Sequence, residues 1–112
     1  MSEPNHIPEQ PQAAMIRMVS DIFHLQPGDE KAFAKRLAAA INVLAANDMN
    51  SLLQLLYRLD VSEKKIREVL DVPSGLTAGE LIAPLIMERE LQKAEARNAF
   101  RAREDIPEDE KW

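Results

Sequence analysis

The stretch that decides the fold reads TAGELIAPLIMERELQKAEARNAFRAR and spans residues 77–103. Thr77 and Glu80 match the capping box, in which a hydroxyl and a carboxylate satisfy each other's backbone donors at the start of a helix. The apolar residues that follow point nearly all round such a helix, as in a buried segment. After Leu91 the large apolar residues stop until Phe100. The stretch therefore predicts one long helix that begins in the core and partly projects from the domain.

A proline interrupts the backbone hydrogen bonding of this predicted helix. Pro84 has no N–H to donate to the carbonyl of Glu80, four residues earlier. We therefore expect either a kink or a short lead-in turn at that point.

Upstream of residue 77, apolar residues recur at helical spacing in four shorter stretches, and no sustained alternation of period two predicts a strand. Asp29 and Ser62 are typical N-cap residues, and we expect Asn47 to cap the end of the second helix. The pattern predicts an all-α fold, a compact four- to five-helix bundle with a long, partly projecting C-terminal helix. The four shorter helices are expected over residues 12–24, 29–47, 48–59 and 62–71.

The charge distribution suggests how the chain is organised. The whole chain of 112 residues has a formal net charge of −5, yet residues 13–103 contain 13 basic and 12 acidic residues. The negative excess therefore lies at the two ends. We predict a flexible N-terminal arm over 1–11, a single helical domain over 12–103 and an acidic flexible tail over 104–112.

The predicted third helix is apolar over too wide an arc for burial on one side. Its large apolar residues cover roughly 200°, whereas a helix with one buried face needs an arc of about 100° or a little more. The helix is therefore either central in the domain or buried partly against another chain. The candidate self-association surface comprises Met49, Leu52, Leu55, Leu56 and Leu59.

Basic residues recur at every fourth position of the last helix. Steps of four advance about 40° round a helix, so these cations form one slowly winding stripe that could track phosphates or meet an acidic partner. The alternative is an exposed face with local ion pairs such as Glu90 with Lys93. We also hypothesise that the acidic tail competes for the stripe. The candidate stripe comprises Arg89, Lys93, Arg97, Arg101 and Arg103.

The sequence contains no motif typical of a catalytic, metal-binding or phosphate-binding site. There is no cysteine, which excludes a disulfide, a thiolate zinc site and a cysteine nucleophile. His6 lies in a proline-rich segment and His24 on the polar face of a predicted helix end, and neither has the neighbours that a general base needs. No metal-binding spacing and no glycine-rich phosphate loop occur. We therefore predict a protein that is not an enzyme and needs no cofactor or metal.

The hydropathy pattern bears on localisation. The first dozen residues lack the basic start and apolar run of a secretory signal. The longest apolar run, residues 81–87, is far shorter than the about 20 residues that span a bilayer. We therefore expect a cytoplasmic protein with no membrane partner.

Two stretches carry a resemblance. DMNSLLQLLYRLDVSEKKIREVLD (residues 48–71) and ELIAPLIMERELQKAEARNAF (residues 80–100) resemble a family of small uncharacterised all-helical proteins of Bacteroidetes-type bacteria. The resemblance rests on leucine and charge patterns. It implies an all-helical fold and brings with it no activity, ligand or functional residue.

Taken together, these features favour a non-enzymatic protein–protein interaction module, with either a protein partner or a second copy of the chain as its target. The alternative is a nucleic-acid- or ribosome-associated accessory protein that uses the basic stripe. Residues 62–82 hold two helical patterns flanking a turn, but the apolar start of the second pattern lacks the polar side chains of a DNA recognition helix.

Overall fold

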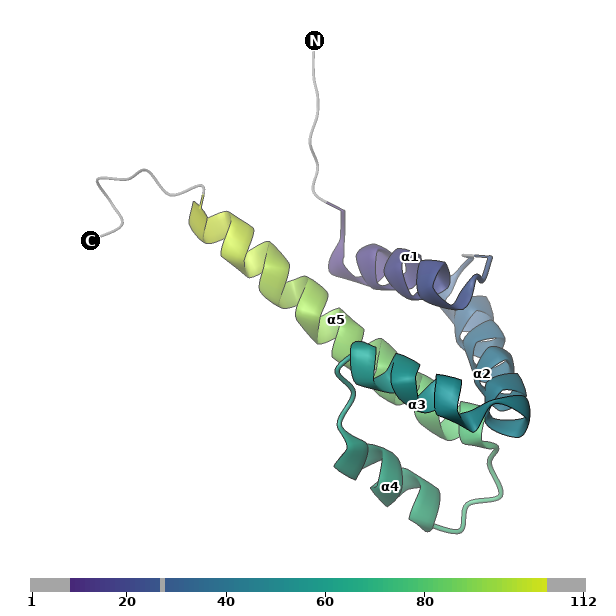
Figure 1. Cartoon of the computed structure of the whole chain (residues 1–112). Helices are drawn as coiled ribbons and strands as arrows, with labels where there is room; N and C mark the ends of the chain where they lie inside the picture. The colour runs from purple at the N-terminus through teal and green to yellow at the C-terminus, as the bar shows by residue number, and fades with distance from the viewer. Residues whose placement is uncertain (1–8, 27, 105–112) are drawn as a thin grey trace.

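The computed structural model describes residues 9–26 and 28–104, and within them the side chains up to residue 100. These residues form five helices and no strand (Figure 1). The all-α fold and its long C-terminal helix are thereby confirmed. The helices are α1 (Pro11–Phe23), α2 (Glu30–Asn47), α3 (Met49–Arg58), α4 (Glu63–Asp71) and α5 (Ala78–Glu104).

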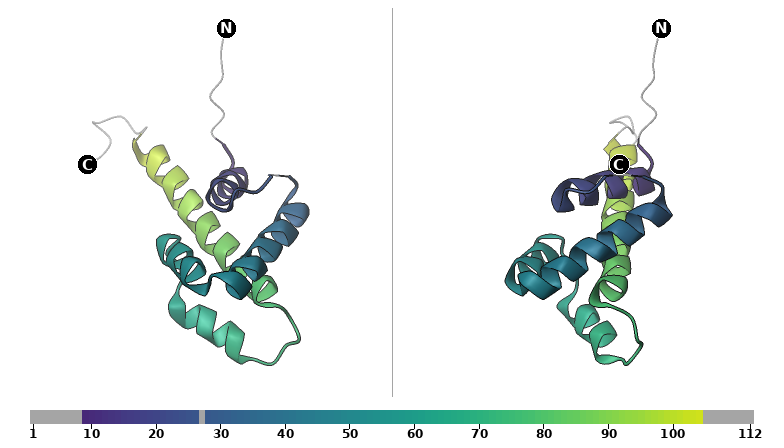
Figure 2. Two further views of the ribbon diagram at one scale, coloured as in Figure 1. Left: turned by 45° about the vertical axis from the view of Figure 1, so that its right-hand side comes forward. Right: turned by 90° about the vertical axis from the view of Figure 1, so that its right-hand side faces the viewer.

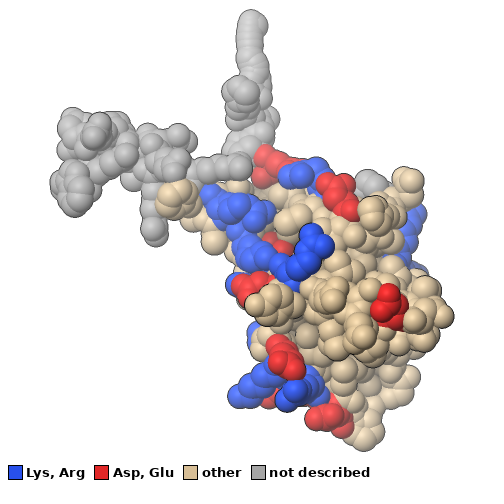
Figure 3. Space-filling view, viewed as in Figure 1, with Lys and Arg blue, Asp and Glu red and all other residues tan. Residues whose placement is uncertain are grey.

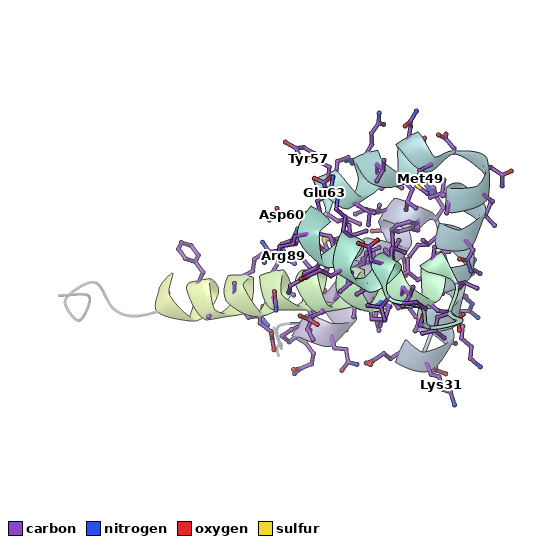
Figure 4. The ribbon with its side chains drawn as sticks, turned by 90° about the horizontal axis from the view of Figure 1, so that it is seen from below. Lys31, Met49, Tyr57, Asp60, Glu63 and Arg89 are labelled. Atoms are coloured by element: carbon purple, nitrogen blue, oxygen red, sulfur yellow. The ribbon has the colours of Figure 1, made fainter. Side chains whose placement is uncertain are left out.

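The long helix α5 is the element against which the others are arranged. Helices α1, α2 and α4 all pack on it, while α3 packs mainly on α2. In Figure 2, α2 and α5 form a V, with α1 in its opening and α3 and α4 toward its apex. The C-terminal end of α5 extends beyond the other helices (Figure 4), as its lack of large apolar residues predicts.

The core is built from the apolar stripes that the sequence predicts. Phe33, Leu37 and Ile41 of α2 are fully buried, and so is Ile86 of α5. Two positions run against the polarity of their side chains. Ser20 is polar but buried at 3% exposure, and Leu70 is apolar but 44% exposed.

The crossing of α2 and α5 is unusually close. At the start of α5, Gly79 lies directly against the backbone carbonyl of Ala38. The side chain of Asn42 accepts a hydrogen bond from the Gly79 N–H at 2.7 Å and donates one to the Thr77 hydroxyl at 3.1 Å. A side chain of α2 thus helps to cap α5, which joins the helices through polar contacts as well as packing.

The predicted N-terminal caps are present. Thr77 and Glu80 form the expected capping box, with the Glu80 N–H donating to the Thr77 hydroxyl and the Thr77 N–H to the Glu80 carboxylate. Asp29 and Ser62 cap α2 and α4. Asn47 is the last residue of α2 rather than its cap, because Asp48 both ends α2 and caps α3.

Pro84 does not divide α5 into two helices. The helix runs as one element from Ala78 to Glu104 with the proline inside it, so no separate lead-in turn forms. Since Pro84 is only the seventh residue of α5, the bond it removes lies within the first two turns.

The predicted arm and tail lie mostly outside the described residues. Of the arm, residues 9–11 are described, and the carboxylate of Glu9 pairs with Arg17 at 2.7 Å. Of the tail, only Glu104 is described, as the last residue of α5.

Candidate interaction site

The wide apolar arc of α3 divides between the core and the surface. Leu52, Leu56 and Leu59 are 1–2% exposed and belong to the core. Met49 is 47% exposed, and Leu55 is half-buried. The five residues that the sequence grouped into a self-association surface therefore do not form one face, and three of them are covered by the chain itself.

The exposed apolar residues of α3 form a different set. Met49, Leu53 and Tyr57 are 47%, 52% and 87% exposed. They follow each other at intervals of four residues, so they form one stripe about 12 Å long. We call these three residues the α3 stripe. Figure 4 shows Met49 and Tyr57 along the same outer edge of the molecule. Sequence reasoning left out Leu53 and Tyr57, although their spacing from Met49 could have identified them.

An apolar groove of about 230 Å³ runs beside this stripe, between α3 and α4. Leu56 and Ile66 are buried residues of this groove, and Glu63 is its one charged residue. The groove is lined by Leu53, Leu56, Tyr57, Val61, Glu63 and Ile66. The stripe and the groove therefore form a continuous, mostly apolar area on one side of the bundle.

The turn between α3 and α4 positions this groove. Asp60, the residue after the C-cap Leu59 of α3, adopts a left-handed conformation with φ of 61°. The Asp60 N–H donates to the Tyr57 carbonyl and the Val61 N–H to the Leu56 carbonyl, which is the Schellman pattern that ends a helix. Because Asp60 takes the place that glycine usually occupies in this pattern, its side chain remains available for a further contact.

Two cations of the predicted basic stripe hold this turn. Arg89 donates to the carbonyl of Asp60 at 3.1 Å and to its carboxylate at 2.6 Å. Lys93 donates to the carbonyl of Leu59 at 3.2 Å. Backbone carbonyls at a helix end lack intrahelical partners and attract cations. Arg89 and Lys93 are therefore engaged in fastening the end of α3 to α5.

The other cations of the stripe differ in their surroundings. Arg97 is exposed and lines a small hollow together with Arg17 and Glu9. Arg101 and Arg103 lie in α5, but their side chains fall outside the described residues. The competing acidic tail falls outside them as well. The structure thus divides the stripe into an internally bound part and a remainder that begins at Arg97.

The ion pair between Asp60 and Arg89 predicts an acid-dependent loss of stability. The guanidinium beside it holds the pKa of the Asp60 carboxyl below its ordinary value of 3.8. Because the pKa of Asp60 is lower in the folded chain, the ion pair stabilises the fold fully at pH values above the ordinary pKa. This stabilisation is lost as the pH falls through the pKa of the folded chain. We expect Asp60→Asn, which still tolerates a positive φ, to be less stable than the wild-type chain near neutral pH.

The difference between Asp60→Asn and the wild-type chain should shrink as acid is added. Urea unfolding at a series of pH values from about 7 down to about 2.5 measures it. A difference that stays constant across that range would show that Asp60 contributes through its shape and not through its charge.

The sequence predicts a solvent-exposed charged face on α5, and Glu90 differs most from this prediction. Its side chain is fully buried, and its Oε1 atom lies 2.9 Å from the ammonium of Lys93. Among the described residues, neither carboxylate oxygen accepts a hydrogen bond of good geometry. Ala94, one turn further along α5, is buried and lines a hollow with Ala14 of α1, so this face of α5 is turned toward α1. The predicted pair of Glu90 and Lys93 exists, but its carboxylate is buried and only its ammonium reaches the surface.

The described part of the chain shows no candidate metal site. No group of three or more histidine, aspartate or glutamate side chains there could hold a metal ion. His24 is exposed at the end of α1, and His6 lies outside the described residues. None of the helices in residues 9–26 and 28–104 has the length and apolar character that crossing a bilayer requires.

Comparisons with protein-family models, curated proteins and solved structures yield no match for this chain. The resemblance to Bacteroidetes-type proteins stays a prediction.

Proposed function

We propose that this protein is a non-enzymatic interaction module that associates with a second copy of itself through the α3 stripe. The observation that carries the proposal is the stripe itself, three large apolar side chains in a row that are each about half or more exposed. Soluble monomers rarely leave large contiguous apolar patches open to water, and such patches mark binding sites.

The electrostatics of α3 favour a second copy as the occupant. Residues 49–57 carry no charged side chain, and Arg58 is the only charged residue of the helix. A neutral face meets no like-charge repulsion when it faces its own copy, whereas a charged partner would find no complement there. Two-fold symmetric dimers are also the commonest form of self-association.

The spacing of the stripe suggests how two copies meet. A two-fold axis through Leu53 aligns the two α3 helices antiparallel and brings Met49 of one chain opposite the partner's Tyr57. This arrangement places the sulfur of Met49 against the aromatic ring of Tyr57, which is a favourable contact. It also aligns the two helix dipoles antiparallel, which is favourable as well. The same stripe is thus complementary to itself in one orientation.

The neighbouring groove supplies the remaining area. A stable interface buries about 800 Å² on each partner, which is more than three side chains provide. The apolar groove between α3 and α4 extends the stripe on one side. We therefore expect each chain to cover this groove of the other in addition to the contact between the two stripes.

Replacing the central residue of the stripe should abolish association. We expect Leu53→Asp to weaken dimer formation at least tenfold, because it places two carboxylates at the two-fold axis in an apolar contact. Leu76→Asp is the matched control, since Leu76 is 51% exposed and Leu53 52%. Sedimentation equilibrium measures both. A wild-type chain that stays monomeric at high micromolar concentration contradicts the proposal, and so does an equal effect of the two substitutions.

A crosslinking experiment tests the orientation. The chain contains no cysteine, so a single Leu53→Cys substitution introduces the only thiol. Two such residues facing each other across a two-fold axis come within the Cα separation of about 4.4–6.8 Å that a disulfide requires. Mild oxidation should then yield covalent dimers of Leu53→Cys but few of Leu76→Cys. Equal yields would exclude a two-fold axis at Leu53.

A further inference from the structure

A second and larger groove opens on the other flank of α3. Its volume is about 610 Å³, and it lies between the end of α1, the second half of α2 and one side of α3. In the space-filling view, the face that these helices turn to the viewer is largely free of charged side chains (Figure 3). The groove is lined by Ile22, Phe23, His24, Ala40, Val43, Leu44, Ser51, Gln54, Leu55 and Arg58.

The depth of this groove follows from the packing of the helices. Helices α1 and α3 each pack on α2 but do not pack closely against one another, which leaves the space between them open. Ala40 contributes the smallest side chain of the lining, so α2 does not fill that space. Large apolar side chains therefore face a hollow instead of a neighbouring helix.

Charge in the groove is confined to one end of α3. Arg58 is the only arginine or lysine of the lining, and no carboxylate lines the groove. Within the described residues, Arg58 forms neither an ion pair nor a side-chain hydrogen bond, in contrast to Arg89. Ser51 and Gln54 add uncharged polar groups to the α3 side. An apolar trough with a free guanidinium is complementary to a molecule that has an apolar body and one negative charge.

We propose that this groove binds a single-chain amphiphile bearing one carboxylate, the chemistry of a free fatty acid. The apolar tail lies along Ile22, Val43 and Leu55, and the carboxylate pairs with Arg58. The fork of a guanidinium matches a carboxylate with two parallel hydrogen bonds. The volume lies within the roughly 300–1,000 Å³ of small-molecule sites, which are likewise mostly apolar with few polar groups.

This site is separate from the proposed dimer contact. Arg58 lies five residues after Leu53 and therefore about 140° round the helix from it. The groove and the α3 stripe thus occupy different flanks of α3. A chain that fails to dimerise can still bind the amphiphile, and the two proposals can fail independently.

Binding of decanoate tests the site. Titration into the full chain, followed by amide chemical shifts, should show saturable changes at the ends of α1 and α3. Decanol carries the same tail without the charge, and we expect it to bind about tenfold more weakly because the contact with Arg58 is missing. Arg58→Gln should reduce the affinity for decanoate to that for decanol. Arg67→Gln, an exposed arginine of α4, is the matched control and should leave both affinities unchanged.

Two further variants separate the alternatives. Ala40→Leu fills the hollow and should abolish decanoate binding while the helical circular dichroism is retained, and Leu53→Asp should bind decanoate as the wild type does. Binding to anionic phospholipid vesicles without binding of free decanoate would overturn the proposal in favour of a membrane surface. Equal losses in Arg58→Gln and Arg67→Gln would overturn it in favour of general charge attraction, and loss of dimers in Ala40→Leu would assign the groove to the second copy.

Discussion

Replacing Gly79 with alanine is expected to destabilise the fold by about 3 kcal/mol or more, since overpacking of a close contact costs about 1–3 kcal/mol and here a hydrogen bond is lost as well. A Cβ atom at this position would clash with the carbonyl oxygen of Ala38 and lie 2.9 Å from the side-chain oxygen of Asn42. The first contact involves backbone, so no rotamer change relieves it, and α2 and α5 must separate. Helix propensity alone predicts the opposite sign, because alanine favours a helix over glycine by about 1 kcal/mol.

The other two glycines serve as controls for this substitution. At Gly28 the nearest atom to a new Cβ is the mobile end of Arg36 at 2.9 Å, and we expect a small effect. At Gly75 there is open space but a φ of +74°, so alanine should cost about 1–2 kcal/mol through the left-handed backbone alone. Urea unfolding of the three variants should place Gly79→Ala far below the others. A stability of Gly79→Ala equal to or above that of the wild-type chain would show that α2 and α5 do not cross as closely as described.

Removing the ammonium of Lys93 should have an effect of similar size. Lys93→Met leaves the buried carboxylate of Glu90 without its counter-charge, and loss of one partner of a buried ion pair typically costs about 3–5 kcal/mol. Glu90→Leu removes the buried partner instead. The Lys93 side chain is 28% exposed and keeps its bond to the Leu59 carbonyl, so we expect this variant to be as stable as the wild type or more so by about 1–4 kcal/mol.

The double variant Glu90→Leu/Lys93→Met completes the cycle. It should recover most of the stability that Lys93→Met loses, short of about 1 kcal/mol for the hydrogen bond to Leu59. If Lys93→Met does not fold at all, folding of the double variant supports the same conclusion. A double variant no more stable than Lys93→Met would show that Lys93 acts through α3 and not through Glu90.

Much of the fold could be predicted from local sequence because its signals act within a few residues. Thr77 and Glu80 are close enough in the chain to form a capping box wherever α5 lies, and Asp29 and Ser62 cap their helices in the same way. The stripe of Phe33, Leu37 and Ile41 needs only helical periodicity to predict burial. These inferences were confirmed because they depend on spacing along one helix.

The candidate site could be predicted only in outline. The excessive apolar arc of α3 was visible in the sequence, but periodicity does not say which part of an arc the neighbouring helices cover. Leu52 and Leu53 are adjacent and chemically identical, yet one is 1% and the other 52% exposed. The large groove beside Arg58 was not predictable, because its walls come from three helices that the sequence does not place relative to one another.

The sequence by itself determined the helices, their caps and the apolar excess of α3, since each depends on residues within a few turns of one another. Only the tertiary structure decided which charged side chains are buried or paired, and why one glycine is required. Glu90 and Lys93 resemble an ordinary surface pair until packing buries the Glu90 carboxylate, and Arg89 resembles a free cation until the end of α3 lies beside it. Gly79 carries no local signal of a close approach. Its role follows from the long-range packing of α2 on α5, which brings the backbone carbonyl of Ala38 against it.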